Sequence, residues 1–276
     1  MRPLQAQLNL IESLKSYQSL LVRSLKASFA YRGTTVTALL TSGVVYAIPM
    51  LVWRQVYAQS PEGLPISRAK MFPYLLMANC VSYALAVGIE WRVGNRIRSG
   101  LIATDLLKPI DFQLSQAFQT LSECLFNGSL GLVVFACGYL FLGRDVFPAS
   151  PLAFGLFLIS FILAFFVMFG ICFIFVQGIF YTYAFYGVLT ARGALHLTFS
   201  GISAPLTLYP PLLKAIADWL PFRHTIYTPV SIYMGWAQGT EAIQLIGEQA
   251  AWVLGLFLLG RFLMNKALKQ LEVQGG

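Results

Sequence analysis

The stretch "LAFGLFLISFILAFFVMFGICFIFV", residues 152–176, contains no charged side chain and a single hydroxyl, that of Ser160. A run of about 20 apolar residues is long enough to cross the hydrocarbon core of a bilayer as a helix. The whole chain is rich in apolar residues, since 57% of its 276 residues are hydrophobic and 11% are charged. Soluble domains carry about 25% charged residues. The sequence therefore predicts an all-α integral membrane protein.

Six apolar runs are candidates for membrane spans. They lie at about residues 34–56, 72–89, 118–142, 152–176, 185–208 and 250–264. The segment before them, residues 1–33, contains apolar residues at a spacing of three or four between residues 3 and 30. We expect this amphipathic helix to lie in the headgroup plane, and packing on a partner subunit is the alternative. Residues 1–276 are expected to form one transmembrane domain.

The basic residues predict the orientation of the chain. Its net charge of +8 comes from 19 Lys and Arg residues against 11 Asp and Glu. These basic residues sit at the ends of apolar runs, so we do not expect nucleic-acid binding. Most of them face the cytoplasm if the N-terminus does, which is the bias that the positive-inside rule describes. Both termini and the charged segment at residues 91–117 are therefore expected to be cytoplasmic.

A proline-rich region separates the fifth and sixth runs. Its prolines are Pro205, Pro210, Pro211, Pro221 and Pro229. The apolar pieces between them are too short to cross a bilayer, which predicts re-entrant half-helices over residues 205–240. Non-helical backbone at membrane depth must lie against protein or a water-filled cavity. We expect this region to pack on the extracytoplasmic end of the bundle.

Known catalytic and metal-binding patterns do not occur in the sequence. There is no GxxxxGK[ST] phosphate loop, no HExxH helix, no GxSxG elbow and no CxxC pair among the four cysteines. These patterns would mark nucleotide, zinc or nucleophile chemistry. We therefore expect no catalytic residue and no metal site, so that the chain is not an enzyme.

Ionisable residues inside or near spans are the remaining candidates for function. Glu123 either lines a central cavity or accepts a hydrogen bond from Ser122 or Gln119 near the cytoplasmic interface. Arg192 and His196 lie one helical turn apart. They either face a pore or a partner subunit, or are explained by snorkelling and packing.

Two local signatures connect the chain with a known family. The first is "IRSGLIATDLLKPIDFQ", residues 97–113. The second is "FSGISAPLTLYPPLLKAIADWLPFRHTIYTPVSIYMG", residues 199–235, in which Ser200–Gly201 precedes Pro205–Leu206 and is followed by Leu220–Pro221–Phe222. Together with the N-terminal helix and six spans, they resemble the membrane subunits of ABC-2 type ATP-binding-cassette exporters that work with a separate ATPase chain. The resemblance covers nearly the whole chain.

The resemblance implies that the segment after the second span is a coupling helix that docks on the ATPase. The residues implied are Arg98, Leu101, Ile102, Asp105, Leu106, Lys108 and Pro109. A short helix that carries both charge signs suits docking, with Gly100 turning the chain into it and Pro109 ending it. A solvated loop is the alternative.

The half-helices are implied to form a gate. Its residues are Gly201, Pro205, Leu206, Pro210, Pro221 and Phe222. The implied partners are two ATPase subunits that bind ATP and Mg²⁺, a second permease of the same or a related sequence, and membrane lipid, while this chain binds no cofactor. The implied location is the bacterial cytoplasmic (inner) membrane.

The function expected on this basis is ATP-driven export of an amphipathic or lipid-like compound, a drug or a natural product. The alternative is a secondary transporter driven by an ion gradient. Such transporters need paired charges inside the membrane and usually an internal repeat, and no repeat is visible between the two halves of this sequence.

Overall fold

The computed structural model describes residues 2–30, 32–59, 64–107, 110–182 and 185–274. Every regular element in these residues is a helix, so the predicted all-α class is confirmed. Four stretches of the described residues are long and apolar enough to cross a membrane, and the chain is a multi-pass membrane protein. These stretches are Arg68–Arg98, Phe112–Val146, Pro151–Ile179 and Gly239–Ala267. They contain the second, third, fourth and sixth predicted spans.

The first and fifth predicted spans correspond to helices outside these four stretches. The first lies in α2 (Arg32–Gln59), a helix of 28 residues. The fifth begins with α8 (Phe185–Phe199), whose 15 residues give a length of about 22 Å. That length is shorter than the hydrocarbon core of about 30 Å. The run predicted over residues 185–208 is not one helix, because a turn with Gly201 at φ +83° follows α8.

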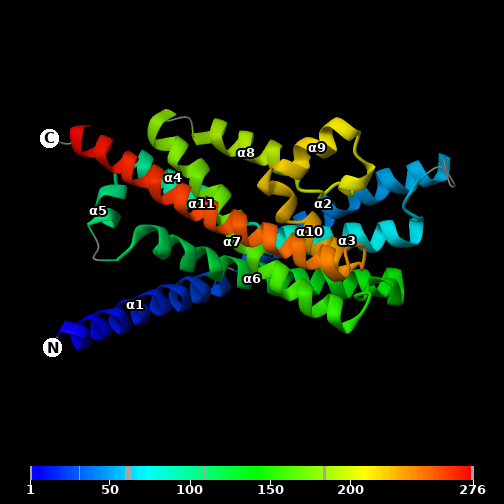
Figure 1. Cartoon of the computed structure of the whole chain (residues 1–276), viewed down its shortest axis with the longest axis horizontal. Helices are drawn as coiled ribbons and strands as arrows, with labels where there is room; N and C mark the ends of the chain where they lie inside the picture. Colours follow the sequence, from blue (N-terminus) through cyan, green and yellow to red (C-terminus); the bar gives the residue numbers. More distant parts are fainter. Residues whose placement is uncertain (1, 31, 60–63, 108–109, 183–184, 275–276) are drawn as a thin grey trace.

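Helix α7 (Pro151–Thr182) is the centre of the bundle. It is apolar on all sides, which is typical of a helix that is covered by several neighbours. Helices α4 (Ile89–Arg98), α10 (Tyr227–Tyr233) and α11 (Gly239–Gln274) pack on it, and Figure 1 shows α11 running alongside it. The hydroxyl of Ser160 in α7 donates to Gln249 Oε1 of α11 at 2.7 Å. A buried polar pair therefore fixes these two helices against each other.

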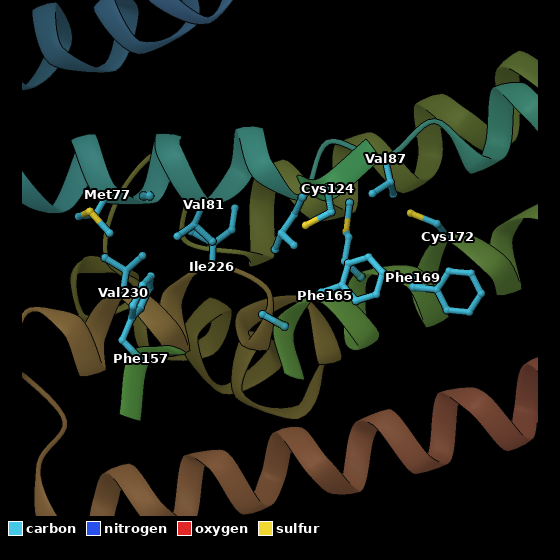
Figure 2. Packing of buried hydrophobic residues seen from close by; sticks show 14 of the residues in the cluster. Met77, Val81, Val87, Cys124, Phe157, Phe165, Phe169, Cys172, Ile226 and Val230 are labelled. Atoms are coloured by element: carbon cyan, nitrogen blue, oxygen red, sulfur yellow. The ribbon is translucent and has the colours of Figure 1, made fainter. Parts of the chain in front are cut away.

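The hydrophobic core joins the long helices to the proline-rich region. Met77 and Val81 of α3 (Arg68–Ala84) face Ile226 and Val230, and Phe157 of α7 lies beside them (Figure 2). The side chains of Ile226 and Val230 are completely buried. The part of the proline-rich region around Ile226 and Val230 thus belongs to the folded core.

The N-terminal helix α1 (Arg2–Ala30) packs lengthwise on the first half of α6 (Phe112–Leu142). The ring of Tyr17 stacks on Phe118 with centroids 5.2 Å apart, and Phe29 meets Phe126 edge-on at 4.9 Å. The helix predicted for residues 3–30 is therefore present, and its apolar face is at least partly covered by the same chain. Its position relative to the membrane surface stays a prediction.

The proline-rich region contains short helices, as its spacing of prolines predicts. They are η2 (Leu206–Leu208), α9 (Pro211–Trp219), η3 (Pro221–His224) and α10. Pro211 and Pro221 occupy first helical positions, where the missing N–H costs nothing. Helix α11 then begins at Gly239, eleven positions before the predicted sixth span, and it continues to Gln274. The hydropathy pattern located only the apolar middle of this helix.

Candidate coupling site

The second span is broken near its end, between α3 and α4. Residues 85–88 are not helical, and backbone groups in an apolar layer need partners within the protein. Two side chains of α6 supply them. Glu123 Oε2 accepts from the Gly88 N–H at 2.8 Å, and Asn127 Nδ2 donates to the Ala86 carbonyl at 2.7 Å. The break is therefore held in place by the neighbouring helix.

Helix α4 is fastened on two sides by ion pairs. Arg92 pairs with Glu123 of α6, and it also donates to Gln116 Oε1 and to Thr120 Oγ1, each at 3.0 Å. On the other side, Arg192 of α8 donates from Nε to Glu90 Oε1 at 2.7 Å, and the Glu90 side chain is 2% exposed. Charges inside a membrane protein are normally paired in this way. A movement of α4 must therefore displace α6 and α8 or break these pairs.

The chain turns from α4 into the short helix α5 (Ile102–Leu106). Gly100 has φ +73°, a conformation that suits glycine because it has no Cβ. Arg96 of α4 forms an ion pair with Asp105 of α5. Ile102 is 3% exposed and packs inward, whereas Leu101 and Leu107 are 49% and 84% exposed. Helix α5 is thus anchored to α4, and an exposed leucine lies at each of its ends.

The end of this segment is also fixed, by the contacts of Asp111. Its carboxylate caps α6 by accepting from the Leu114 N–H at 2.9 Å, and it pairs with Arg261 of α11. Its own N–H donates to the hydroxyl of Tyr17 in α1 at 3.0 Å. The carboxylate at an N-cap also interacts favourably with the helix dipole. Three helices therefore meet at this one residue.

Of the residues predicted to couple, Leu101, Ile102, Asp105 and Leu106 lie together on and beside α5. Arg98 is in the last turn of α4, with its guanidinium 5.7 Å from the centre of the Phe185 ring. Lys108 and Pro109 lie outside the described residues. Asp105 and Ile102 face the protein, so the exposed leucines Leu101 and Leu107 are the outward part of this surface.

The candidate cavity residues separate into two groups. Arg192 and His196 line a cavity of about 400 Å³ between α8, α7 and the break after α3. His196 Nε2 lies 3.1 Å from Thr225 Oγ1. Glu123 is instead engaged by Arg92 and Gly88, and its partners differ from the predicted Ser122 and Gln119, because the Ser122 hydroxyl donates to the Gln119 carbonyl.

The residues implied to form a gate lie around the short helices. Gly201 is in the turn after α8, and its carbonyl accepts from the Tyr74 hydroxyl at 2.6 Å. Leu206, Pro205, Pro221 and Phe222 are buried, and Pro210 is exposed. Leu206 lines a cavity of about 250 Å³. Next to this group, burial lowers the pKa of the His224 imidazole to about 3, with Arg223 acting in the same direction.

None of Glu90, Arg92, Asn127, Asp111 and Arg261 was predicted from the sequence as a site residue. Glu90 and Arg92 flank Trp91 at the end of an apolar run. Opposite charges at these two positions indicate partners on two sides of the helix. The partners are 31 and 102 positions away in sequence, so local spacing does not reveal them.

The described residues contain no cluster of three or more His, Cys, Asp or Glu side chains that could hold a metal ion. A comparison with protein families matches residues 44–275 to the family described as "ABC-2 family transporter protein". The matched range includes the break, α5 and the proline-rich region. No curated protein matches the sequence.

Proposed function

The chain belongs to the ABC-2 transporter family, and we propose that its helix α5 is the surface on which the partner ATPase docks. In this family the membrane component is not catalytic and binds no cofactor. Nucleotide chemistry then takes place in a separate ATPase chain, which carries the phosphate loop that this sequence lacks.

The exposed leucines of the α5 segment carry the proposal. Leu101 and Leu107 flank the short helix α5, which is held to α4 by the ion pair between Arg96 and Asp105. Figure 1 shows α5 at the end of the molecule where the N-terminus of α1 and the C-terminus of α11 also lie. Apolar anchors surrounded by polar groups are typical of protein interfaces. The alternative partner of these leucines is the membrane surface, and co-purification of the ATPase distinguishes the two partners.

The ion pairs of α4 support a route for mechanical coupling. A displacement of α5 reaches α4 through Arg96, and α4 is fastened to α6 by Arg92 and to α8 by Glu90. Packed cores switch between discrete arrangements and do not deform continuously. Closure of an ATPase pair below α5 would thus tilt α4 and shift the break between α3 and α4.

The remaining features of the transporter are proposals of the same kind. Helix α2 would serve as the first of six spans, and α8 together with the turn that follows it would form the fifth, with both termini in the cytoplasm. The segment 205–240 would enter the membrane from the outside as re-entrant half-helices and form the gate, with Leu206 and Phe222 at its centre. The complex would contain a second permease and two ATPase subunits, and its cargo would be an amphipathic or lipid-like compound, a drug or a natural product.

Co-purification tests the docking surface. The tagged chain is isolated from the membranes of its own host, and bound ATPase is identified by mass spectrometry as a chain with a GxxxxGK[ST] loop. We expect Leu107→Asp to lose the ATPase. The matched control is Leu152→Asp, because Leu152 is 72% exposed in the first turn of α7, where a carboxylate is tolerated. Retention of the ATPase by Leu107→Asp would refute docking on α5.

One observation favours the alternative of an ion-driven transporter. The pairs Arg92–Glu123 and Arg192–Glu90 are charges inside candidate spans or beside them, and secondary transporters use such charges. Transport that continues after depletion of ATP, and stops when the ion gradient is collapsed, would support this alternative.

A further inference from the structure

A cavity of about 730 Å³ lies between α3, α6 and α7. Its walls include Met77 and Val81 of α3, Leu125 and Phe135 of α6, and Phe157 of α7. Ligand pockets typically have volumes of about 300–1,000 Å³. This apolar groove is separate from α5, from the ion pairs of α4 and from the gate residues.

Two glycines of α6 form part of the groove lining where α6 contacts α3. A Cβ at Gly128 would lie 3.8 Å from the Ala84 Cβ, and one at Gly131 would lie 3.3 Å from the Cys80 carbonyl. Helices α3 and α6 therefore touch closely along this line. The opposite wall is a row of aromatic rings on α7, in which Phe157 lies 6.3 Å from Phe154 and 6.0 Å from Phe161.

Both hydroxyl groups in the lining of the groove already donate within the protein. The hydroxyl of Ser129 donates to the Phe126 carbonyl at 2.6 Å, and that of Tyr233 donates to the Val146 carbonyl at 2.9 Å. A buried water needs two to four polar partners, so water is a poor occupant. An alkyl chain needs none.

The dimensions and the mouth of the groove fit one lipid. From Cys124 to Phe135 the α6 wall is about 16 Å long at 1.5 Å per residue, which is half of a hydrocarbon core of about 30 Å. Leu125 and Leu132 on its rim are exposed, so the groove opens sideways. Phe147 and Pro148 line one end of it, next to the turn η1 (Gly143–Val146) with its exposed Arg144 and Asp145.

We propose that this groove holds an acyl chain of a glycerophospholipid from the leaflet that contains the turn η1. The chain lies along the glycines of α6 and the phenylalanines of α7, and the phosphate lies at the level of Arg144. The lipid fills the space between α6 and α7 and keeps these consecutive helices apart. This site is independent of docking by the ATPase.

A photoactivatable lipid tests the site directly. The complex is purified from membranes and reconstituted with phosphatidylglycerol that carries a diazirine in its acyl chain, and the adducts are mapped by peptide mass spectrometry after illumination. We expect adducts on the peptides of the groove, residues 124–135 of α6 and 154–161 of α7. Labelling that is no stronger there than on the exposed side of α2, or that is absent there because another chain covers the groove, would overturn the proposal.

Two variants fill the groove, and one serves as their control. Gly128→Leu places a side chain in it from a helix position where leucine is a better helix former than glycine, and Leu125→Trp narrows its exposed rim. The control is Gly155→Leu on α7, where a Cβ meets nothing within 4 Å. We expect the first two to lose the groove adducts and the control to keep them. Co-purification of the ATPase is followed in parallel, so loss of lipid and loss of docking are seen separately; full labelling of both groove-filling variants would overturn the proposal.

Discussion

Arg92 of α4 and Glu123 of α6 form an ion pair at the break in the second span, and the same carboxylate accepts the Gly88 N–H at 2.8 Å. One side chain thus completes the broken backbone and neutralises the cation beside it. Because of this double role, Glu123 connects the broken second span to α6.

Replacement of Glu123 by leucine leaves both Arg92 and the Gly88 N–H without this partner. Removing one member of a buried pair costs about 3–5 kcal/mol, and the partial exposure of this pair, 21% and 24%, places the expected cost at the lower end of that range. Glu123→Gln keeps an acceptor for Gly88 and should cost less. Thermal unfolding of the purified protein measures both, and equal midpoints for Glu123→Leu and wild type would contradict this role.

The pair Arg96–Asp105 is expected to matter for both coupling and stability. Its side chains are 36% and 11% exposed, so its contribution should exceed the roughly 0.2–1 kcal/mol of a fully exposed pair, and Asp105→Arg, which places a second cation beside Arg96, should lower the unfolding midpoint. It should also uncouple ATP hydrolysis from transport, because α5 is no longer held to α4. The double variant Arg96→Asp with Asp105→Arg restores opposite charges and should recover transport in proteoliposomes. A double variant as inactive as the single one would show that the pair itself is not the connection.

Gly201 is predicted to tolerate no side chain. Its φ of +83° is unfavourable for other residues, and a Cβ would come within 2.9 Å of both the Tyr227 Cβ and the Tyr74 hydroxyl. Gly201→Ala should therefore destabilise the protein by about 1–2 kcal/mol from the backbone conformation alone, with more from the contacts. Gly247→Ala in α11, where a Cβ meets nothing within 4 Å, is the control and should be neutral or stabilising.

Because His224 is buried, we predict that the free energy of unfolding decreases at acid pH. Its folded pKa of about 3 lies below its ordinary value of 6.5, so the neutral form is the one that the fold favours. The contribution of the neutral imidazole to the free energy of unfolding is complete above pH 6.5, and it is lost as the pH falls from there toward 3. The loss by pH 5 is about 2 kcal/mol at 1.36 kcal/mol per pKa unit. Asp218, Arg223 and Glu248 are the charged groups around it.

The comparison of wild type with His224→Gln isolates this effect. The glutamine variant cannot take up the proton, so its unfolding midpoint should fall less between pH 7 and pH 5 than that of wild type. Parallel curves for the two proteins over this range would show that His224 is not the group that titrates.

The apolar runs of the sequence predict where some helices lie but not where they end. The run at residues 152–176 lies within α7, because a long apolar helix has few alternatives in a membrane. The ends of the other helices were not predictable, since α11 continues to Gln274 well past its apolar part. Hydropathy measures which residues can lie in lipid, and helices can extend beyond that layer.

The break at residues 85–88 shows a second limit. No proline marks it, and Gly88 is its one local sign. The groups that stabilise it belong to Glu123 and Asn127, which no periodicity connects with α3. The segment after the second span contains the short helix α5, and the inward direction of Asp105 and Ile102 depends on tertiary contacts that the sequence does not show.

Site-specific photocrosslinking tests the central claim, that α5 docks on the ATPase, most directly. A benzophenone amino acid is placed at position 107 in the complex within its native membrane, and the same amino acid at position 152 serves as the control. Illumination should join the chain covalently to the ATPase from position 107 and not from position 152. Crosslinks from position 107 only to lipid, or no crosslink to the ATPase in a complex that still hydrolyses ATP, would contradict the account.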